Sequence, residues 1–137
     1  MKRLFLDTDI ILDLLSQRDP FYESVAKVAT LADRRELVLV ASPISFTTVD
    51  YVLSKFESTE LVLNKLRRFK ILCEVGSIDQ ETIEKALNSD FADFEDAVQY
   101  FCAVQADCSV IITRNRKDFR QSILPIMTAA EFLSSIG

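Results

Sequence analysis

Short, continuously apolar runs of strand length recur along the chain, separated by segments in which apolar residues have helical spacing. The clearest runs cover residues 3–7, 37–41, 71–75 and 109–112, and a weaker one at 124–127 contains a proline, which an edge strand tolerates. Between them, apolar side chains recur three and four residues apart, as in an amphipathic helix. This alternation is typical of an α/β fold whose parallel sheet is covered on both faces.

Capping residues and chain breakers set the expected limits of the helices. Asp79 is a good N-cap, Thr128 and Glu131 have the spacing of a capping box, and Pro20 ends the first helical segment. No change of composition marks a linker and no repeat is visible, so we predict a single domain over residues 1–137. The predicted helices cover residues 8–15, 21–34, 43–54, 59–69, 80–88, 93–106 and the segment after 128.

The composition excludes several classes of site. The 137 residues contain no histidine, which removes Ser-His triads and His-ligated zinc. Glycine occurs only at positions 76 and 137, so neither a Walker loop nor a dinucleotide-binding loop can form. No apolar run approaches the roughly 20 residues of a membrane span, and three cysteines without metal-ligand spacing indicate buried, reduced thiols. We therefore expect a cytoplasmic protein whose chemistry relies on carboxylates.

Carboxylates stand at the places where a parallel sheet binds ligands. Asp7 ends the first apolar run, and Asp118 follows the fourth by six residues, so both belong at the carboxyl edge of the sheet. Asp93 and Asp96 open a helix whose following residues are apolar nearly all round, which indicates that Asp96 is delivered into the protein. Helix capping alone would also explain Asp7, Asp9 and Asp93.

Several carboxylates in one pocket require compensation. Two of them about 4 Å apart repel by roughly 4 kcal/mol at an effective dielectric constant near 20. A cation between them relieves this repulsion, and oxygen-only ligands select Mg²⁺ or Mn²⁺, which suits phosphodiester hydrolysis. Asp50 lies mid-helix between apolar neighbours, where it either points into the site or is a solvated surface residue.

Polar and cationic residues surround Asp118. Thr113 and Asn115 offer a hydroxyl and an amide that suit the support of neighbouring carboxylates or of a metal-bound water. A net charge of −5 argues against a broad basic surface, but local cations can still hold backbone phosphates. A solvated loop is the plain alternative for the cations of this turn, which include Arg114, Arg116 and Lys117.

These residues resemble a known family, the PIN-domain superfamily, and within it the VapC-like toxin ribonucleases. The resemblance rests on Leu6–Asp9 after the first strand, Phe94–Ala97 at the start of a buried helix, and Ile112–Phe119 after a strand. It implies a three-layer α/β/α sandwich with a mainly parallel sheet of four to five strands, often in the order 3-2-1-4-5. It also implies an endoribonuclease that depends on Mg²⁺ or Mn²⁺.

The resemblance assigns roles residue by residue. Asp7, Asp96 and Asp118 match the acidic positions of the family's metal site, and Thr113 matches its hydroxyl position. The remaining acid, usually a glutamate on the helix after the second strand, falls on Asp50 by position. Asp9 stands where the family often has asparagine. A homodimer and inhibition by a small antitoxin protein are further expectations of the resemblance.

Three alternatives compete with this interpretation. The Asp7–Asp9 pair resembles the start of a haloacid dehalogenase phosphatase, but Ile11 stands where that class has threonine or valine. A receiver domain would need an aspartate at the end of its central strand, whereas the third run here ends in Glu74, Val75 and Gly76. A PIN-like module that binds RNA or a protein without cleaving anything stays open.

Overall fold

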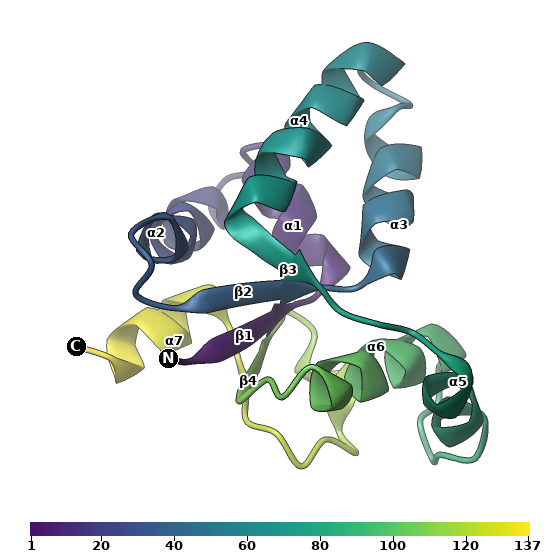
Figure 1. The fold of residues 1–137 in the computed structure, drawn as a ribbon. Coiled ribbons are helices and arrows are strands. Elements are labelled where there is room, and N and C mark those ends of the chain that lie inside the picture. The colour runs from purple at the N-terminus through teal and green to yellow at the C-terminus, as the bar shows by residue number, and fades with distance from the viewer.

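The computed structural model describes all 137 residues and contains one sheet of five strands, all parallel, in the order β3-β2-β1-β4-β5 (Figure 1). The predicted parallel α/β fold and the expected strand order are confirmed. None of the helices is both long enough and apolar enough to cross a bilayer. The strands are β1 (Arg3–Leu6), β2 (Val38–Ala41), β3 (Cys73–Val75), β4 (Val110–Ile112) and β5 (Ile126–Met127).

Helices cover both faces of this sheet, and most begin at the predicted capping residues. Asp79 and Thr128 each form a capping box, and Ser42 and Ser58 also cap helices. The helices are α1 (Thr8–Leu15), α2 (Tyr22–Asp33), α3 (Pro43–Leu53), α4 (Thr59–Leu72), α5 (Gln80–Leu87), α6 (Phe94–Gln105) and α7 (Ala129–Ser135), with a short 3₁₀ turn, η1 (Arg116–Phe119).

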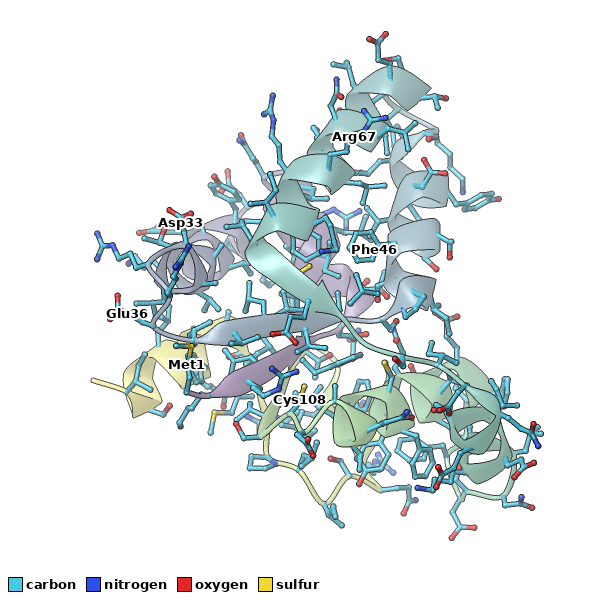
Figure 2. The ribbon with its side chains drawn as sticks, viewed as in Figure 1. Met1, Asp33, Glu36, Phe46, Arg67 and Cys108 are labelled. Atoms are coloured by element: carbon cyan, nitrogen blue, oxygen red, sulfur yellow. The ribbon has the colours of Figure 1, made fainter.

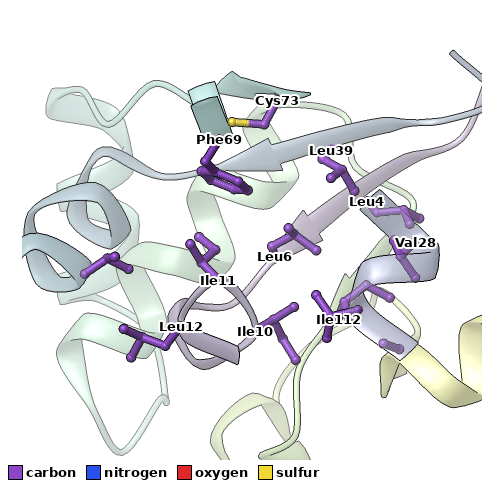
Figure 3. Close-up of a cluster of buried hydrophobic side chains, with 14 of the residues drawn as sticks. Leu4, Leu6, Ile10, Ile11, Leu12, Val28, Leu39, Phe69, Cys73 and Ile112 are labelled. Atoms are coloured by element: carbon purple, nitrogen blue, oxygen red, sulfur yellow. The ribbon is translucent and has the colours of Figure 1, made fainter. Parts of the chain in front are cut away.

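The strands alternate their side chains between two cores. Leu4, Leu6 and Ile112 point to the face covered by α1, α2, α3, α4 and α7, where they form the larger cluster (Figure 3). Phe5 and Ile111 point to the opposite face, which α6 covers, with α5 beside it (Figure 1). This accounts for the continuous apolar residues of β2, β4 and the last three positions of β1, because both faces of the central sheet are buried.

The pair α3 and α4 rises away from the sheet as a hairpin (Figure 1). Phe46 points from α3 towards α4 (Figure 2), and its ring lies 5.7 Å from that of Phe69. One boundary prediction was wrong here, because Ile71 and Leu72 belong to α4 and β3 begins only at Cys73. A short apolar run does not distinguish a strand from the last turn of a helix.

All three cysteine thiols are free and buried, as the sequence predicted. Burial raises the pKa of Cys73 and Cys102 to about 11 and that of Cys108 to about 12. Neutral thiols of this kind behave as small apolar groups.

Candidate active site

The candidate site lies at the carboxyl edge of the sheet, where β1 and β4 end side by side. The parallel register pairs Leu6 with Ile112, so the next residues, Asp7 and Thr113, are neighbours. Asp7 is also the N-cap of α1, and its Oδ1 accepts a 2.9 Å hydrogen bond from the backbone N–H of Thr8. Asp7 therefore caps α1 and lies at the candidate site at the same time.

A hollow of about 420 Å³ opens at this edge, and we call it the acidic hollow. Its walls come from α1, α3, the start of α6 and the turn after β4, and they contain no cationic side chain. The fold therefore brings Asp7, Asp96 and Asp118 together from three distant parts of the sequence. Six carboxyl groups line the hollow, those of Asp7, Asp9, Asp93, Glu95, Asp96 and Asp118.

Asp7 is the most buried of these acids, with 8% of its surface exposed. Burial, opposed by its hydrogen bonds and aided by Asp9 and Asp118, raises the pKa of Asp7 to about 6. The hydroxyl of Thr113 donates to Asp7 Oδ2 over 2.8 Å and accepts from the backbone N–H of Asn115 over 3.0 Å. Since Thr113 is fully buried behind Asp7, it positions the carboxylate and does not line the hollow.

Asp96 enters the hollow from the first turn of α6. Burial is the largest cause that raises the pKa of Asp96 to about 7, followed by the charges of Asp118 and Asp93. Asp93 caps the helix by accepting a 3.0 Å hydrogen bond from the backbone N–H of Asp96. On the opposite wall, the amide of Asn115 donates to Asp9 Oδ2 over 2.8 Å, so both supporting acids have fixed hydrogen bonds.

The donor chemistry of the acidic hollow fits a hard divalent cation. Several carboxylates that have raised pKa values and no cationic side chain beside them are the ligands expected for Mg²⁺ or Mn²⁺. The side chains are not arranged as a ready-made cage, because no three of them have the spacing of a metal-ligand set. Asp7, Asp96 and Asp118, which reach the hollow from three different elements, are the side chains that would hold the ion.

Asp50 is not among the residues that line the acidic hollow. Its Oδ1 accepts a 3.3 Å hydrogen bond from the hydroxyl of Ser54, one turn further along α3. Thr48 and Val52 of the same helix face the hollow instead. Two residues along a helix correspond to about 200° of rotation, so Asp50 lies on a different side of α3 from these two residues.

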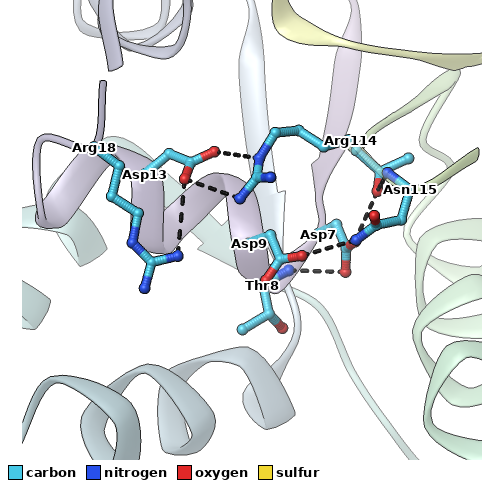
Figure 4. A network of polar contacts seen from close by, with 8 residues as sticks. Asp7, Thr8, Asp9, Asp13, Arg18, Arg114 and Asn115 are labelled. Carbon is cyan, nitrogen blue, oxygen red and sulfur yellow. Dashed lines mark hydrogen bonds and ion pairs between the residues drawn. The ribbon is translucent and has the colours of Figure 1, made fainter. Parts of the chain in front are cut away.

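The cations of the turn differ in their partners. Arg114 donates to Asp13 over 2.8 and 3.2 Å, and its guanidinium lies 4.0 Å from the ring centre of Phe21. Asp13 is fully buried between Arg114 and Arg18 (Figure 4). Arg116 is ion-paired with Glu131 at the start of α7.

Arg114 and Arg116, which the sequence suggested as substrate contacts, are therefore engaged with carboxylates of the protein. Lys117 forms no ion pair with any acidic side chain. It faces a second hollow beside the first.

Sequence reasoning missed a buried polar cluster behind the acids. Gln99 is 1% exposed, and its amide donates to the hydroxyls of Thr8 and Ser45 over 3.2 and 2.9 Å. These two hydroxyls are 2.8 Å apart, so α1, α3 and α6 are joined at one point. The available signal was a lone polar side chain within the apolar run of α6, three residues after Asp96.

Comparison with known families bears directly on this arrangement. A family model described as a PIN domain matches residues 3–117. The chain belongs to the PIN-domain family. A curated relative of this PIN domain, Ribonuclease VapC1 of Aquifex aeolicus, is 26% identical over 136 residues, which cover 96% of this chain and 93% of the relative.

Solved structures support the same fold for this PIN domain. A DNA-bound VapBC structure from Salmonella typhimurium contains a chain that matches with a TM-score of 0.71 and 19% identity, covering 94% of this chain and 99% of that one. VapC20 of Mycobacterium tuberculosis, described as a toxin that cleaves the sarcin-ricin loop, matches with a TM-score of 0.61 and 14% identity, covering 79% of this chain and 86% of that one.

Proposed function

We propose that this PIN domain is an endoribonuclease that uses Mg²⁺ or Mn²⁺ to hydrolyse RNA phosphodiester bonds, and that it is the toxin of a toxin–antitoxin pair. The observation that carries the proposal is the acidic hollow, in which Asp7, Asp96 and Asp118 lie together with no cationic side chain among the lining residues. The relative named Ribonuclease VapC1 and the VapBC structures support the choice of substrate and of biological context.

The residues of the chain would divide the work. When bound, the divalent ion supplies an activated water and stabilises the negative charge that develops on the phosphate. Asp7 accepts one hydrogen bond on each carboxylate oxygen, from Thr8 and from Thr113, and this fixes the orientation of the carboxylate. The pKa of Asp96 is raised to about 7 by burial and by the neighbouring carboxylates, so binding of a divalent cation here is coupled to the loss of its proton.

The test compares three isosteric variants, Asp7→Asn, Asp96→Asn and Asp50→Asn. We expect the first two to abolish cleavage of a fluorescent single-stranded RNA in Mg²⁺ or Mn²⁺, with melting temperatures equal to or above that of the wild type. Asp50→Asn is the matched control, because Asp50 lies outside the hollow, and it should keep activity.

Melting in metal separates the nuclease from a module that only binds. Metal at 100 times its dissociation constant should raise the free energy of unfolding by about 2.7 kcal/mol. A wild-type protein whose melting temperature does not respond to millimolar Mg²⁺ or Mn²⁺, and which leaves RNA intact, would refute the nuclease proposal.

The α3–α4 hairpin supports the proposed partners. Tyr51, Phe56 and Leu61 are 68%, 81% and 55% exposed, so this hairpin carries three large apolar side chains that the rest of the chain leaves mostly uncovered. Exposed apolar patches commonly mark protein interfaces. We propose that this surface serves a homodimer or a small antitoxin, and a Phe56→Glu variant should weaken the association seen by light scattering or by co-purification.

A further inference from the structure

A second hollow lies directly beside the acidic hollow, and we call it the flanking hollow. Its volume is about 210 Å³, and it shares Asp93, Asp96 and Asp118 with its neighbour. Sites for drug-sized ligands run to roughly 300–1,000 Å³, so this one accommodates a smaller group. When one unit of a polymer lies in the acidic hollow, the neighbouring unit is therefore close enough to enter the flanking hollow.

The flanking hollow contains the cations that the acidic hollow lacks. Lys117 and Arg120 line it together with Asp90 and the three shared acids, and neither cation forms an ion pair. The other two cations of the same turn are engaged, Arg114 with Asp13 and Arg116 with Glu131. A phosphate beside the acidic hollow would therefore find its positive partners on this side.

An aromatic ring and an amide complete the flanking hollow. Phe91 is half-buried, and its ring centre lies 5.1 Å from that of Tyr100 and 6.3 Å from that of Phe101, so it is held in place. The hydroxyl of Tyr100 accepts a 3.2 Å hydrogen bond from the backbone N–H of Ile123, which attaches the loop after η1 to α6. Gln121 adds an exposed amide with both donors and an acceptor.

We propose that the flanking hollow binds the nucleotide adjacent to the scissile phosphate of single-stranded RNA. The base lies against Phe91 within reach of Gln121, and Lys117 and Arg120 hold its backbone phosphate. Bases stack on aromatic rings with little dependence on sequence, whereas the amide of Gln121 can form hydrogen bonds with a base edge. The base must leave its own stack to enter the hollow, so unpaired RNA is bound in preference to duplex RNA.

The proposal rests on the proposed ribonuclease function, and the experiment distinguishes the two. Binding of a fluorescein-labelled single-stranded RNA ten-mer of mixed sequence is followed by fluorescence anisotropy in an Asp7→Asn background, in which cleavage is blocked. The variants are Lys117→Ala, Arg120→Ala and Phe91→Leu. Arg116→Ala is the matched control, because it removes a charge from the same turn whose partner is Glu131.

We expect Lys117→Ala and Arg120→Ala each to weaken binding and to reduce the slope of log affinity against log salt by about 0.7, the value for one phosphate contact on a single strand. Phe91→Leu should weaken binding by about 5- to 150-fold, as the loss of a stacked base does. Arg116→Ala should keep the wild-type slope, and a hairpin duplex of the same length should bind more weakly to every protein.

Two results would overturn the inference while the ribonuclease proposal stands. In the first, wild-type protein cleaves RNA but Lys117→Ala and Arg120→Ala behave like Arg116→Ala. In the second, duplex RNA binds as tightly as single-stranded RNA. A wild-type protein that neither cleaves nor binds RNA overturns both proposals. Urea unfolding shows whether Phe91→Leu is folded, and the surface variants decide the matter if it is not.

Discussion

The buried ion pair between Asp13 and Arg114 allows a sharp test of how the turn after β4 is held. Asp13 has no exposed surface, whereas the side chain of Arg114 is 27% exposed. Arg114→Met removes the guanidinium, keeps an apolar stem and leaves the carboxylate of Asp13 buried. The remaining cation nearby is Arg18, whose closest nitrogen lies 4.0 Å from Asp13 Oδ1.

The expected cost follows from the buried charge. Removing one partner of a buried pair typically costs about 3–5 kcal/mol. Arg18 provides partial compensation, so we expect a loss of about 3 kcal/mol in the free energy of unfolding for Arg114→Met. With a urea m-value near 2 kcal/mol/M, the midpoint would fall by about 1.5 M.

A double-mutant cycle isolates the pair from general effects of the substitution. Asp13→Asn combined with Arg114→Met removes both charges, and it should recover at least about 1 kcal/mol relative to the sum of the single variants. Arg116→Met is the control, because its partner Glu131 is exposed and such pairs contribute little. Equal urea midpoints for Arg114→Met and Arg116→Met, or single effects that simply add in the double variant, would show that the Asp13–Arg114 pair does not stabilise the fold.

Three further predictions concern the hollow and the sheet. The pKa values of Asp7 and Asp96 are raised from 3.8 to about 6 and about 7. Between about pH 5 and pH 7, where the acids with lowered pKa values are already ionised, these two groups therefore keep protons in the folded metal-free protein that the unfolded chain has lost. The melting temperature of the metal-free protein should therefore fall as the pH rises through this window. Thr113→Val leaves Asp7 Oδ2 without its donor and should cost about 1–3 kcal/mol in urea unfolding. Gly76→Ala places a Cβ 2.7 Å from Cys102 Sγ and should cost about 1–3 kcal/mol.

Each of these predictions has its own control. Asp7→Asn should flatten the pH dependence of the melting temperature, and an unchanged slope would contradict the assignment of the raised pKa. Thr113→Ser retains the hydroxyl and should restore most of the loss seen with valine. Gly76→Ala should lower the free energy of unfolding less in a Cys102→Ala background than in the wild type, since the crowded sulfur is gone. An equal loss in both backgrounds would show that contact with this sulfur is not the cause.

The sequence predicted the layers and the three central acids because both depend on local patterns. Continuous apolar runs determine which segments are doubly buried, and the carboxyl ends of parallel strands meet at one edge whatever the tertiary detail. Asp7 and Asp118 could therefore be placed from their position after a strand, and Asp96 from the apolar helix behind it.

The missed features depend on contacts between distant parts of the chain. Arg114 looks like a free cation in sequence, and its partner Asp13 lies 101 residues away. Its apolar neighbours left open whether Asp50 points into the site, and only the family resemblance assigned it a metal-site position. The rotation of α3 is decided by packing against α1 and α4, and Thr48 faces the hollow instead. Gln99 shows the same limit, since its partners come from two other helices.

Three consecutive residues after β4 each hold a different point of α1 and its cap. Thr113 bonds to Asp7, Arg114 to Asp13, and Asn115 to Asp9. Because three side chains attach this backbone segment to three different residues, the segment cannot rotate about any single one of these bonds. Asp118 lies three residues further on, so its position depends on this fixed segment. Added residues between Thr113 and Asn115 would therefore displace Asp118, whereas an insertion after Phe119 would lengthen only the loop that leads to β5.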